Sequence, residues 1–131
     1  MIVVDASVLA NALGDDETDG ARARGELSEA AELAGPDLAD VETVAVLRKR
    51  WIAGTLTAKR FAAAIGDLAD LPLTRYPTLP FMRRAYELRS TVSAYDAAYV
   101  ALAEVLDCAL LTSDERLSRA PGIRCQVRVL R

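Results

Sequence analysis

The chain has 131 residues, of which 52% are hydrophobic and 27% are charged, and its formal net charge is −3. A chain of this length forms one domain and can bury roughly two-thirds of the surface that it exposes when unfolded. No apolar run approaches the ~20 residues of a membrane span, and the first residues lack the basic and small-residue features of a secretory signal. We therefore expect a single soluble domain over residues 1–131, located in the cytoplasm and not bound to a membrane.

The residue types that are absent or rare exclude several kinds of chemistry. The chain has no histidine, which rules out Ser-His-Asp and Cys-His nucleophiles, a histidine general base and zinc sites built on histidine. Cys108 and Cys125 lie far apart in apolar surroundings, so we expect buried, reduced thiols. An enzyme with this composition has to use carboxylates, hydroxyls, arginines or a metal ion.

The first half of the chain predicts two short strands and four helices. We expect strands at residues 2–4 and 32–36, and helices at residues 7–13, 20–31, 38–53 and 57–70. The acidic run between Gly14 and Gly20 is typical of a solvated loop that starts the next helix. The helix at 38–53 is predicted from apolar residues that recur at three- and four-residue steps, which are Leu38, Val41, Ala45, Val44, Leu47 and Trp51. This spacing favours a place in the core for Trp51, with stacking on a nucleic-acid base as the alternative.

The second half of the chain continues the alternation of strands and helices. We expect extended segments at residues 71–77, 108–112 and 123–130, helices at 79–91 and 94–106, and a turn with one helical turn at 113–118. Strands that alternate with helices predict a parallel sheet that is covered on both faces. The predicted fold class is therefore a single α/β domain, an αβα sandwich without repeats or linkers.

Four acidic residues lie at the ends of predicted elements. Asp5 ends the first strand, and Asp114 follows the strand at 108–112 by two residues. Glu42 and Asp96 lie in early turns of two helices. Ligands of open α/β sheets bind outside the carboxyl ends of the strands, where the strand order switches. If the first strand and the strand at 108–112 are neighbours, Asp5 and Asp114 share one cleft.

Each of these acids also has a purely structural interpretation. Asp5 is a good N-cap for the helix that follows it. Residues 93–96 (Ser-Ala-Tyr-Asp) and 112–115 (Thr-Ser-Asp-Glu) both match the pattern of a capping box. Glu42 favours the positive end of its helix.

The helical position of Asp96 distinguishes it from a surface cap. Three apolar residues share its helix face, which are Tyr99, Val100 and Ala103. Glu42 shares a helix face with Ala45 and Val46 in the same way. An acid that points inward without a basic neighbour requires a counter-charge, and a metal ion is the strongest candidate.

Three segments together carry a resemblance to a known family. They read VVDASVLA, GPDLADVETVAVLRKR and SAYDAAYVALAEVLDCALLTSDERL. This pattern resembles the PIN-domain ribonucleases, and among them the short bacterial toxins of the VapC type, along essentially the whole chain. The resemblance implies a PIN-like fold and a catalytic role for the acids at four positions, which are Asp5, Glu42, Asp96 and Asp114. All four are present, so the sequence does not indicate a degenerate, inactive copy.

The resemblance also implies a reaction and a cofactor. It implies an endoribonuclease that uses Mg²⁺, with Mn²⁺ as a substitute, and leaves a 5′-phosphate and a 3′-hydroxyl. Because Mg²⁺ usually takes one or two carboxylates directly, we expect Asp5 and Asp96 to be its ligands and Glu42 and Asp114 to act through water or a second ion. Three hydroxyl side chains are expected to orient carboxylates or a water, with helix capping as the alternative: Ser7, Thr112 and Ser113.

Arginine side chains are the candidates for holding the RNA backbone near an acidic pocket. Arg48 and Arg50 follow Glu42 on its helix, and Arg116 follows Asp114 closely. A second basic cluster lies on another helix at Arg83, Arg84 and Arg89. A solvated basic face is the alternative for both helical clusters.

The same resemblance implies partners. It implies a cognate antitoxin protein that blocks the cleft, an RNA substrate, a homodimer and a larger toxin–antitoxin hetero-oligomer. Two other classes of protein are alternatives. A phosphoacceptor signalling domain requires paired acids after the first strand and a lysine after the last, and this chain has neither. A PIN-type module that binds RNA without cleaving it remains the alternative function.

Overall fold

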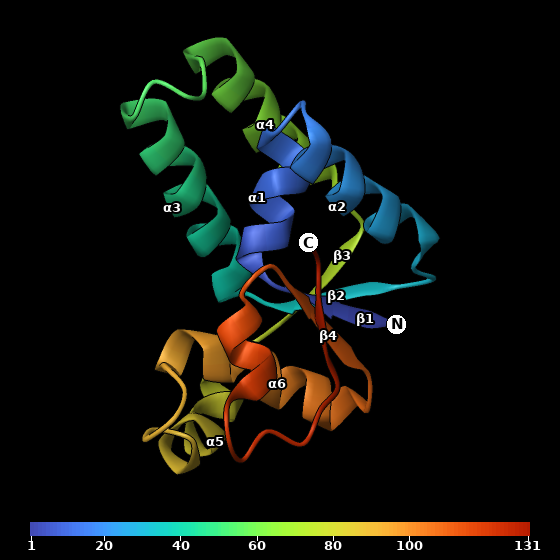
Figure 1. Ribbon diagram of the computed structural model, residues 1–131, viewed down its shortest axis with the longest axis vertical. Helices are drawn as coiled ribbons and strands as arrows, with labels where there is room; N and C mark the ends of the chain where they lie inside the picture. Colours follow the sequence, from blue (N-terminus) through green and yellow to red (C-terminus); the bar gives the residue numbers. More distant parts are fainter.

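The computed structural model describes residues 1–131 as one five-stranded parallel sheet with helices on both faces (Figure 1). The strands are β1 (Ile2–Val4), β2 (Leu33–Pro36), β3 (Leu73–Tyr76), β4 (Ala109–Thr112) and β5 (Val127–Val129). The helices are α1 (Ala6–Gly14), α2 (Thr18–Glu29), α3 (Leu38–Ile52), α4 (Ala58–Asp70), α5 (Met82–Glu87) and α6 (Ala94–Leu106), with 3₁₀ turns η1 (Leu79–Phe81) and η2 (Glu115–Arg119). The predicted α/β class is confirmed. No helix combines the length and the apolar character needed to span a bilayer.

The strand order β3-β2-β1-β4-β5 places β1 at the centre of the sheet. The chain first moves outward from β1 to β3 and then returns to the other side of β1 for β4 and β5, with Val3 beside Leu110. Because crossovers between parallel strands are right-handed, this change of direction places α5 and α6 on the face opposite α1 to α4 (Figure 1). The carboxyl ends of β1 and β4 therefore form the switch point of the sheet, where ligands of such folds bind.

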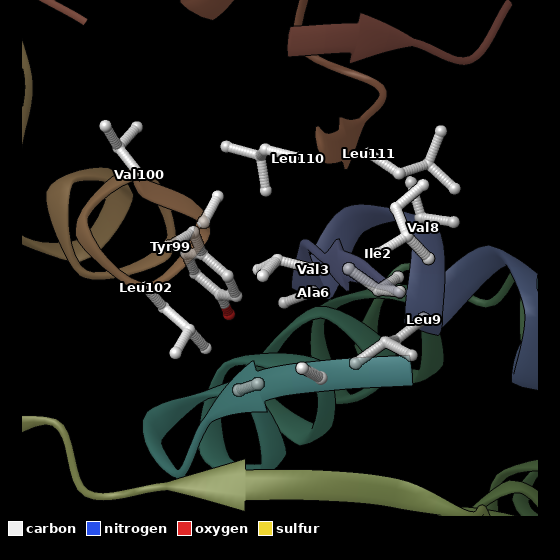
Figure 2. Packing of buried hydrophobic residues seen from close by; sticks show 14 of the residues in the cluster. Ile2, Val3, Ala6, Val8, Leu9, Tyr99, Val100, Leu102, Leu110 and Leu111 are labelled. Carbon is white, nitrogen blue, oxygen red and sulfur yellow. The ribbon is translucent and has the colours of Figure 1, made fainter. Parts of the chain in front are cut away.

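The main core surrounds β1, whose three residues are all buried. Figure 2 shows Tyr99, Val100 and Leu102 of α6 and Val8 and Leu9 of α1 packing around Val3 of β1 and Leu110 and Leu111 of β4. A strand that is covered on both faces has no solvent side, which explains its continuous apolar sequence.

A second, smaller core lies where α3 and α4 pack on α1. It consists of six buried residues, which are Ala10, Leu13, Leu47, Leu56, Ala64 and Leu68. In Figure 1, α3 and α4 extend away from the sheet beside α1. The packing of α3 and α4, together called the α3–α4 arm, therefore depends on few buried side chains.

The predicted apolar face of α3 was partly wrong. Val41 is 73% exposed and Trp51 is 47% exposed, so Trp51 is not a core residue. Its ring lies beside Phe61 of α4, with ring centroids 6.3 Å apart, near the outer end of the arm. The buried residues of α3 are Ala39, Thr43 and Leu47. Their mostly small side chains allow α3 to approach α1 closely, and a pattern of large apolar residues misses such a face.

Several predicted boundaries also differ from the structure. The helix expected over 79–91 divides into η1 and the short α5, and the last strand is limited to Val127–Val129. The acidic segment is not only a loop, because α2 already begins at Thr18. Cys108 and Cys125 are free thiols, as expected, but each is only partly buried. The helix at 94–106 has the predicted bounds.

Candidate active site

Asp5 lies at the switch point, directly after β1, and only 8% of it is exposed. Its Oδ1 accepts a hydrogen bond from the Ser7 amide at 3.1 Å, so Asp5 is the N-cap of α1. Its Oδ2 accepts a hydrogen bond from the Thr112 hydroxyl at 2.7 Å. The capping interpretation is therefore correct, but it accounts for only one of the two carboxylate oxygens.

The Thr112 hydroxyl connects the ends of β4 and β1. Thr112 is fully buried, and besides donating to Asp5 it accepts a hydrogen bond from the Asp114 amide at 3.1 Å. Ser7 and Ser113 meet as well, since the Ser113 amide donates to the Ser7 hydroxyl at 3.3 Å. Of the three predicted hydroxyl residues, Thr112 orients a carboxylate through its side chain, whereas Ser113 takes part through its backbone.

Asp114 caps the short turn η2. Its Oδ1 accepts a hydrogen bond from the Arg116 amide at 3.0 Å, and its carboxylate pairs with the Arg116 guanidinium at 3.2 Å. The capping box expected between Thr112 and Glu115 was wrong, because Asp114 is the residue that caps η2. This frees the Thr112 hydroxyl for Asp5.

Asp96 enters the site from the first turn of α6. Its backbone amide donates to the Ser93 hydroxyl at 3.1 Å, which makes Ser93 the N-cap. Its carboxylate forms no ion pair within the chain. The Ser93 side chain and the charge of Arg116 act on it, but they only partly offset the rise of its pKa. The three apolar residues on its helix face are all buried, as the spacing predicted.

Glu42 of α3 is held by a residue that the sequence analysis assigned only to the apolar face of α6. The Tyr99 hydroxyl donates a hydrogen bond to Glu42 Oε1 at 2.7 Å, and Tyr99 itself is 1% exposed. A buried tyrosine normally requires a partner for its hydroxyl. That requirement was the signal in the sequence, but the identity of the partner depends on how α6 packs over the sheet.

The electrostatics of the site show that its acids lie close enough to influence one another. Burial raises the pKa of Asp5, Glu42 and Asp96 above their ordinary values. Repulsion adds to this shift: Asp114 raises the pKa of Asp5, and Asp5 raises the pKa of both Glu42 and Asp96. Asp114 is the exception, since its hydrogen bond with Arg116 lowers its pKa.

The donor set fits a hydrated, hard divalent cation. No three acidic or thiol side chains converge closely enough to hold an ion by themselves. Mg²⁺ does not require such a cage, because it keeps several waters and binds through one or two carboxylates. The site offers carboxylate and hydroxyl oxygens as ligands, and the Asp96 carboxylate is not tied up in an ion pair. This chemistry suits Mg²⁺ or Mn²⁺ and not a metal that prefers sulfur or nitrogen ligands.

The predicted RNA-binding arginines lie in different places. Arg116 is 88% exposed in its side chain and sits beside the acids through its pair with Asp114. Arg50 instead donates to Asn11 Oδ1 at 2.6 Å and lines a surface hollow between α1 and the α3–α4 arm. Arg48 is exposed on α3. The structure thus brings only Arg116 to the acidic cluster.

Two arginines of the second basic cluster make contacts within the fold. Arg84 pairs with Glu104 at 2.8 Å and with Glu87 at 3.2 Å. The Arg89 guanidinium lies 4.0 Å from the centre of the Tyr86 ring. These contacts favour a structural role for Arg84 over a role in binding RNA.

The family model of the PIN domain matches residues 2–123. The chain belongs to the PIN-domain family. It is 42% identical to ribonuclease VapC9 of Mycobacterium tuberculosis over 130 residues, which cover 99% of this chain and 98% of the relative. Ribonuclease VapC1 of the same organism is 38% identical, with 98% of this chain and 97% of the relative covered. The resemblance inferred from the three sequence segments is confirmed.

Solved structures agree with this assignment. VapC20 of Mycobacterium tuberculosis, described as a toxin that cleaves the sarcin-ricin loop, matches with a TM-score of 0.67 at 15% identity, over 84% of this chain and 87% of that one. VapBC2 of Rickettsia felis, solved bound to a DNA fragment from its promoter, matches with a TM-score of 0.68 at 13% identity, over 100% of both chains. At these identities the likeness shows that the PIN fold is shared.

Proposed function

We propose that this PIN-domain protein is the toxin of a toxin–antitoxin pair and acts as a Mg²⁺-dependent endoribonuclease. The observation that carries the proposal is a set of three carboxyl groups with raised pKa values and no ion pair, Asp5, Glu42 and Asp96, at the switch point between β1 and β4. The relatives that match nearly the whole chain are named VapC ribonucleases, which supports RNA as the substrate.

Each acid has a role that follows from its surroundings. Asp5 and Asp96 would hold the ion, since Thr112 orients one oxygen of Asp5 and the Asp96 carboxylate forms no ion pair. When bound, Mg²⁺ supplies an activated water at neutral pH and neutralises charge on the scissile phosphate. Glu42 is placed to accept a proton from the attacking water, and its raised pKa suits that task. Hydrolysis would leave a 5′-phosphate and a 3′-hydroxyl.

Arg116 is the candidate for binding the RNA backbone next to the scissile bond. Its guanidinium is exposed and pairs with Asp114 at 3.2 Å. Ion pairs that are exposed to solvent are weak. A phosphate group offers the same bidentate geometry with more charge. Arg116 therefore would exchange Asp114 for a phosphate when RNA binds.

The proposal is tested by RNA cleavage with purified, antitoxin-free protein. Cleavage should require Mg²⁺ or Mn²⁺, stop with excess EDTA and produce 5′-phosphate ends. Asp96→Asn should be inactive, whereas Asp67→Asn, the same change at an exposed position of α4, should retain activity. Cleavage that persists in EDTA and leaves cyclic phosphates would contradict the mechanism.

Thermal melts without RNA test the ion site separately. A ligand stabilises only the state that binds it, so Mg²⁺ should raise the melting temperature of the wild type more than that of Asp96→Asn. Equal shifts in the two proteins would place the binding of Mg²⁺ elsewhere on the molecule.

The antitoxin is proposed to act at the same cleft. A partner that presents arginine to these carboxylates would satisfy their missing counter-charges. The solved VapBC2 structure supports an antitoxin as a protein partner. Binding of the antitoxin should then weaken the binding of Mg²⁺, and a complex with the metal still bound and the cleft empty would contradict it. The proposed homodimer is tested by light scattering of the antitoxin-free protein.

A further inference from the structure

The Tyr99 hydroxyl lies at the meeting point of three elements. Tyr99 belongs to α6, its hydroxyl donates to Glu42 of α3 at 2.7 Å, and the amide of Ala6, the first residue of α1, faces the same oxygen. In Figure 2 the ring projects from α6 with its hydroxyl toward Ala6. Since α3 and α6 cover opposite faces of the sheet, this hydroxyl connects the two helical layers at the acidic cluster.

The bond to Tyr99 is the only hydrogen bond that Glu42 makes through its side chain. A glutamate side chain rotates about three bonds, so a free Glu42 would sample many positions. The bond holds Oε1 and leaves Oε2 without a partner. Both Asp5 and Asp96 act electrostatically on Glu42, so its carboxylate is held within the acidic cluster.

We infer that Tyr99 is a positioning residue of the active site, which holds the Glu42 carboxylate in the orientation that the hydrolysis of RNA requires. This inference rests on the proposed function. Tyr99 is 1% exposed and cannot touch RNA, so it acts through Glu42 alone. The competing interpretation is a core tyrosine whose hydroxyl merely satisfies its hydrogen-bonding needs, and in that case its removal would leave the chemistry unchanged.

Tyr99→Phe removes the hydroxyl and keeps the ring that packs in the core. We expect kcat for RNA cleavage to fall roughly 10-fold or more, which is the usual effect of removing a group that orients a metal-site carboxylate. KM for RNA should stay unchanged. The affinity of the RNA-free protein for Mg²⁺, measured by calorimetry, should also fall, because Glu42 contributes to the ion site through a water. Tyr86→Phe makes the same change at a tyrosine on α5 that is 62% exposed, and it should behave as the wild type.

A double-mutant cycle shows whether Tyr99 acts through Glu42. In the Glu42→Gln background, Tyr99→Phe should change the affinity for Mg²⁺ less than 2-fold, because the carboxylate that it positions is gone. If the two changes weaken Mg²⁺ binding independently, the inference is wrong.

The remaining outcomes are also decisive. Unchanged kcat and Mg²⁺ affinity in Tyr99→Phe, with an active wild type, would overturn the role of Tyr99 and leave the proposed function intact. A wild type that does not cleave RNA with Mg²⁺ would overturn the proposed function and this role with it. A Tyr99→Phe protein that no longer folds, as judged by circular dichroism, would make the hydroxyl a structural requirement and would overturn the inference.

Discussion

The two ends of α6 carry acids in opposite electrostatic surroundings. At its start, the Asp96 carboxylate has no ion-pair partner, and burial together with Asp5 and Asp114 raises its pKa despite the opposing effects of Ser93 and Arg116. At its end, Glu104 is also partly buried but accepts hydrogen bonds from Arg84 and from the Arg124 amide. Burial alone would raise the pKa of Glu104, yet these bonds outweigh it and the pKa is lowered.

This difference in pKa shift distinguishes acids that stabilise the fold from acids that destabilise it. Elsewhere the chain matches acids with arginines, as in the pairs Asp40–Arg75 and Asp16–Arg60, both at 3.1 Å. Only the switch point between β1 and β4 gathers carboxyl groups held mainly by hydroxyls and amides. Proteins tolerate such local conflicts where function requires them.

The largest expected effect is on activity, at the start of α6. Asp96→Asn keeps the shape of the side chain and removes its charge. Because a correctly held ion contributes several kcal/mol to the transition state, RNA cleavage should fall roughly 1,000-fold. The metal-free variant should be as stable as the wild type or up to ~1 kcal/mol more stable, because one repelling charge is gone. Initial cleavage rates and urea denaturation in EDTA measure both effects.

The bond from the Asp96 amide to Ser93 is untouched by this change. A strong loss of stability in metal-free Asp96→Asn would therefore show that the carboxylate itself is structural. The contrast between the two ends of α6 would then be lost.

The next effect is on stability, at the end of α6. The Arg84 and Glu104 side chains are 16% and 13% exposed. Arg84→Met should leave Glu104 without its main partner and lower the free energy of unfolding by roughly 2–3 kcal/mol, because an acid that is largely buried is left unpaired. Cleavage activity below the melting temperature should be unchanged. A loss below about 0.5 kcal/mol would mean that this pair is no stronger than a surface salt bridge.

The pH dependence of the metal-free protein is a smaller effect that reports on the whole cluster. Asp5, Glu42 and Asp96 bind protons more tightly when folded, so stability is greatest below their ordinary values of 3.8 and 4.5 and is lost as pH rises through the raised values. The melting temperature in EDTA should thus fall as pH rises above these ordinary values. The fall should be shallower in Asp96→Asn.

The acids with lowered pKa values act in the opposite direction, but below the range of this measurement. Asp114 and Glu104 lose their contribution only as pH falls beneath their ordinary values. A melting temperature that rises with pH above these ordinary values in EDTA would show that the site acids are not destabilising.

The smallest expected effect concerns Thr43, the neighbour of Glu42. Its hydroxyl is buried without a hydrogen-bond partner. Thr43→Val keeps the shape and removes the unpaired group, so the free energy of unfolding should rise by up to about 1 kcal/mol. Thr112→Val is the matched control, since its hydroxyl bonds both Asp5 and Asp114, and it should destabilise the protein. A destabilised Thr43→Val would reveal a partner for that hydroxyl.

Local sequence patterns were sufficient for the fold class and for the positions of the four acids. The alternation of strands and helices depends on residues close in sequence, and so does the capping by Asp5 and Ser93. The inward position of Asp96 also followed from helical spacing, because its apolar neighbours lie on the same helix. The mistaken burial of Trp51 arose where α3 projects beyond the sheet and α4 covers its outer end only in part.

The tertiary structure decided which of these residues meet. The adjacency of β1 and β4 brings Thr112 to Asp5, across 107 positions of the chain. The packing of α6 over the sheet brings Tyr99 to Glu42, across 57 positions. It also tied Arg50 to α1 and left Arg116 beside the acids. Strand order and helix packing determine such partners, so a pattern of neighbouring residues cannot predict them. The chain can bring distant segments together in many ways, and only the buried core selects one of them.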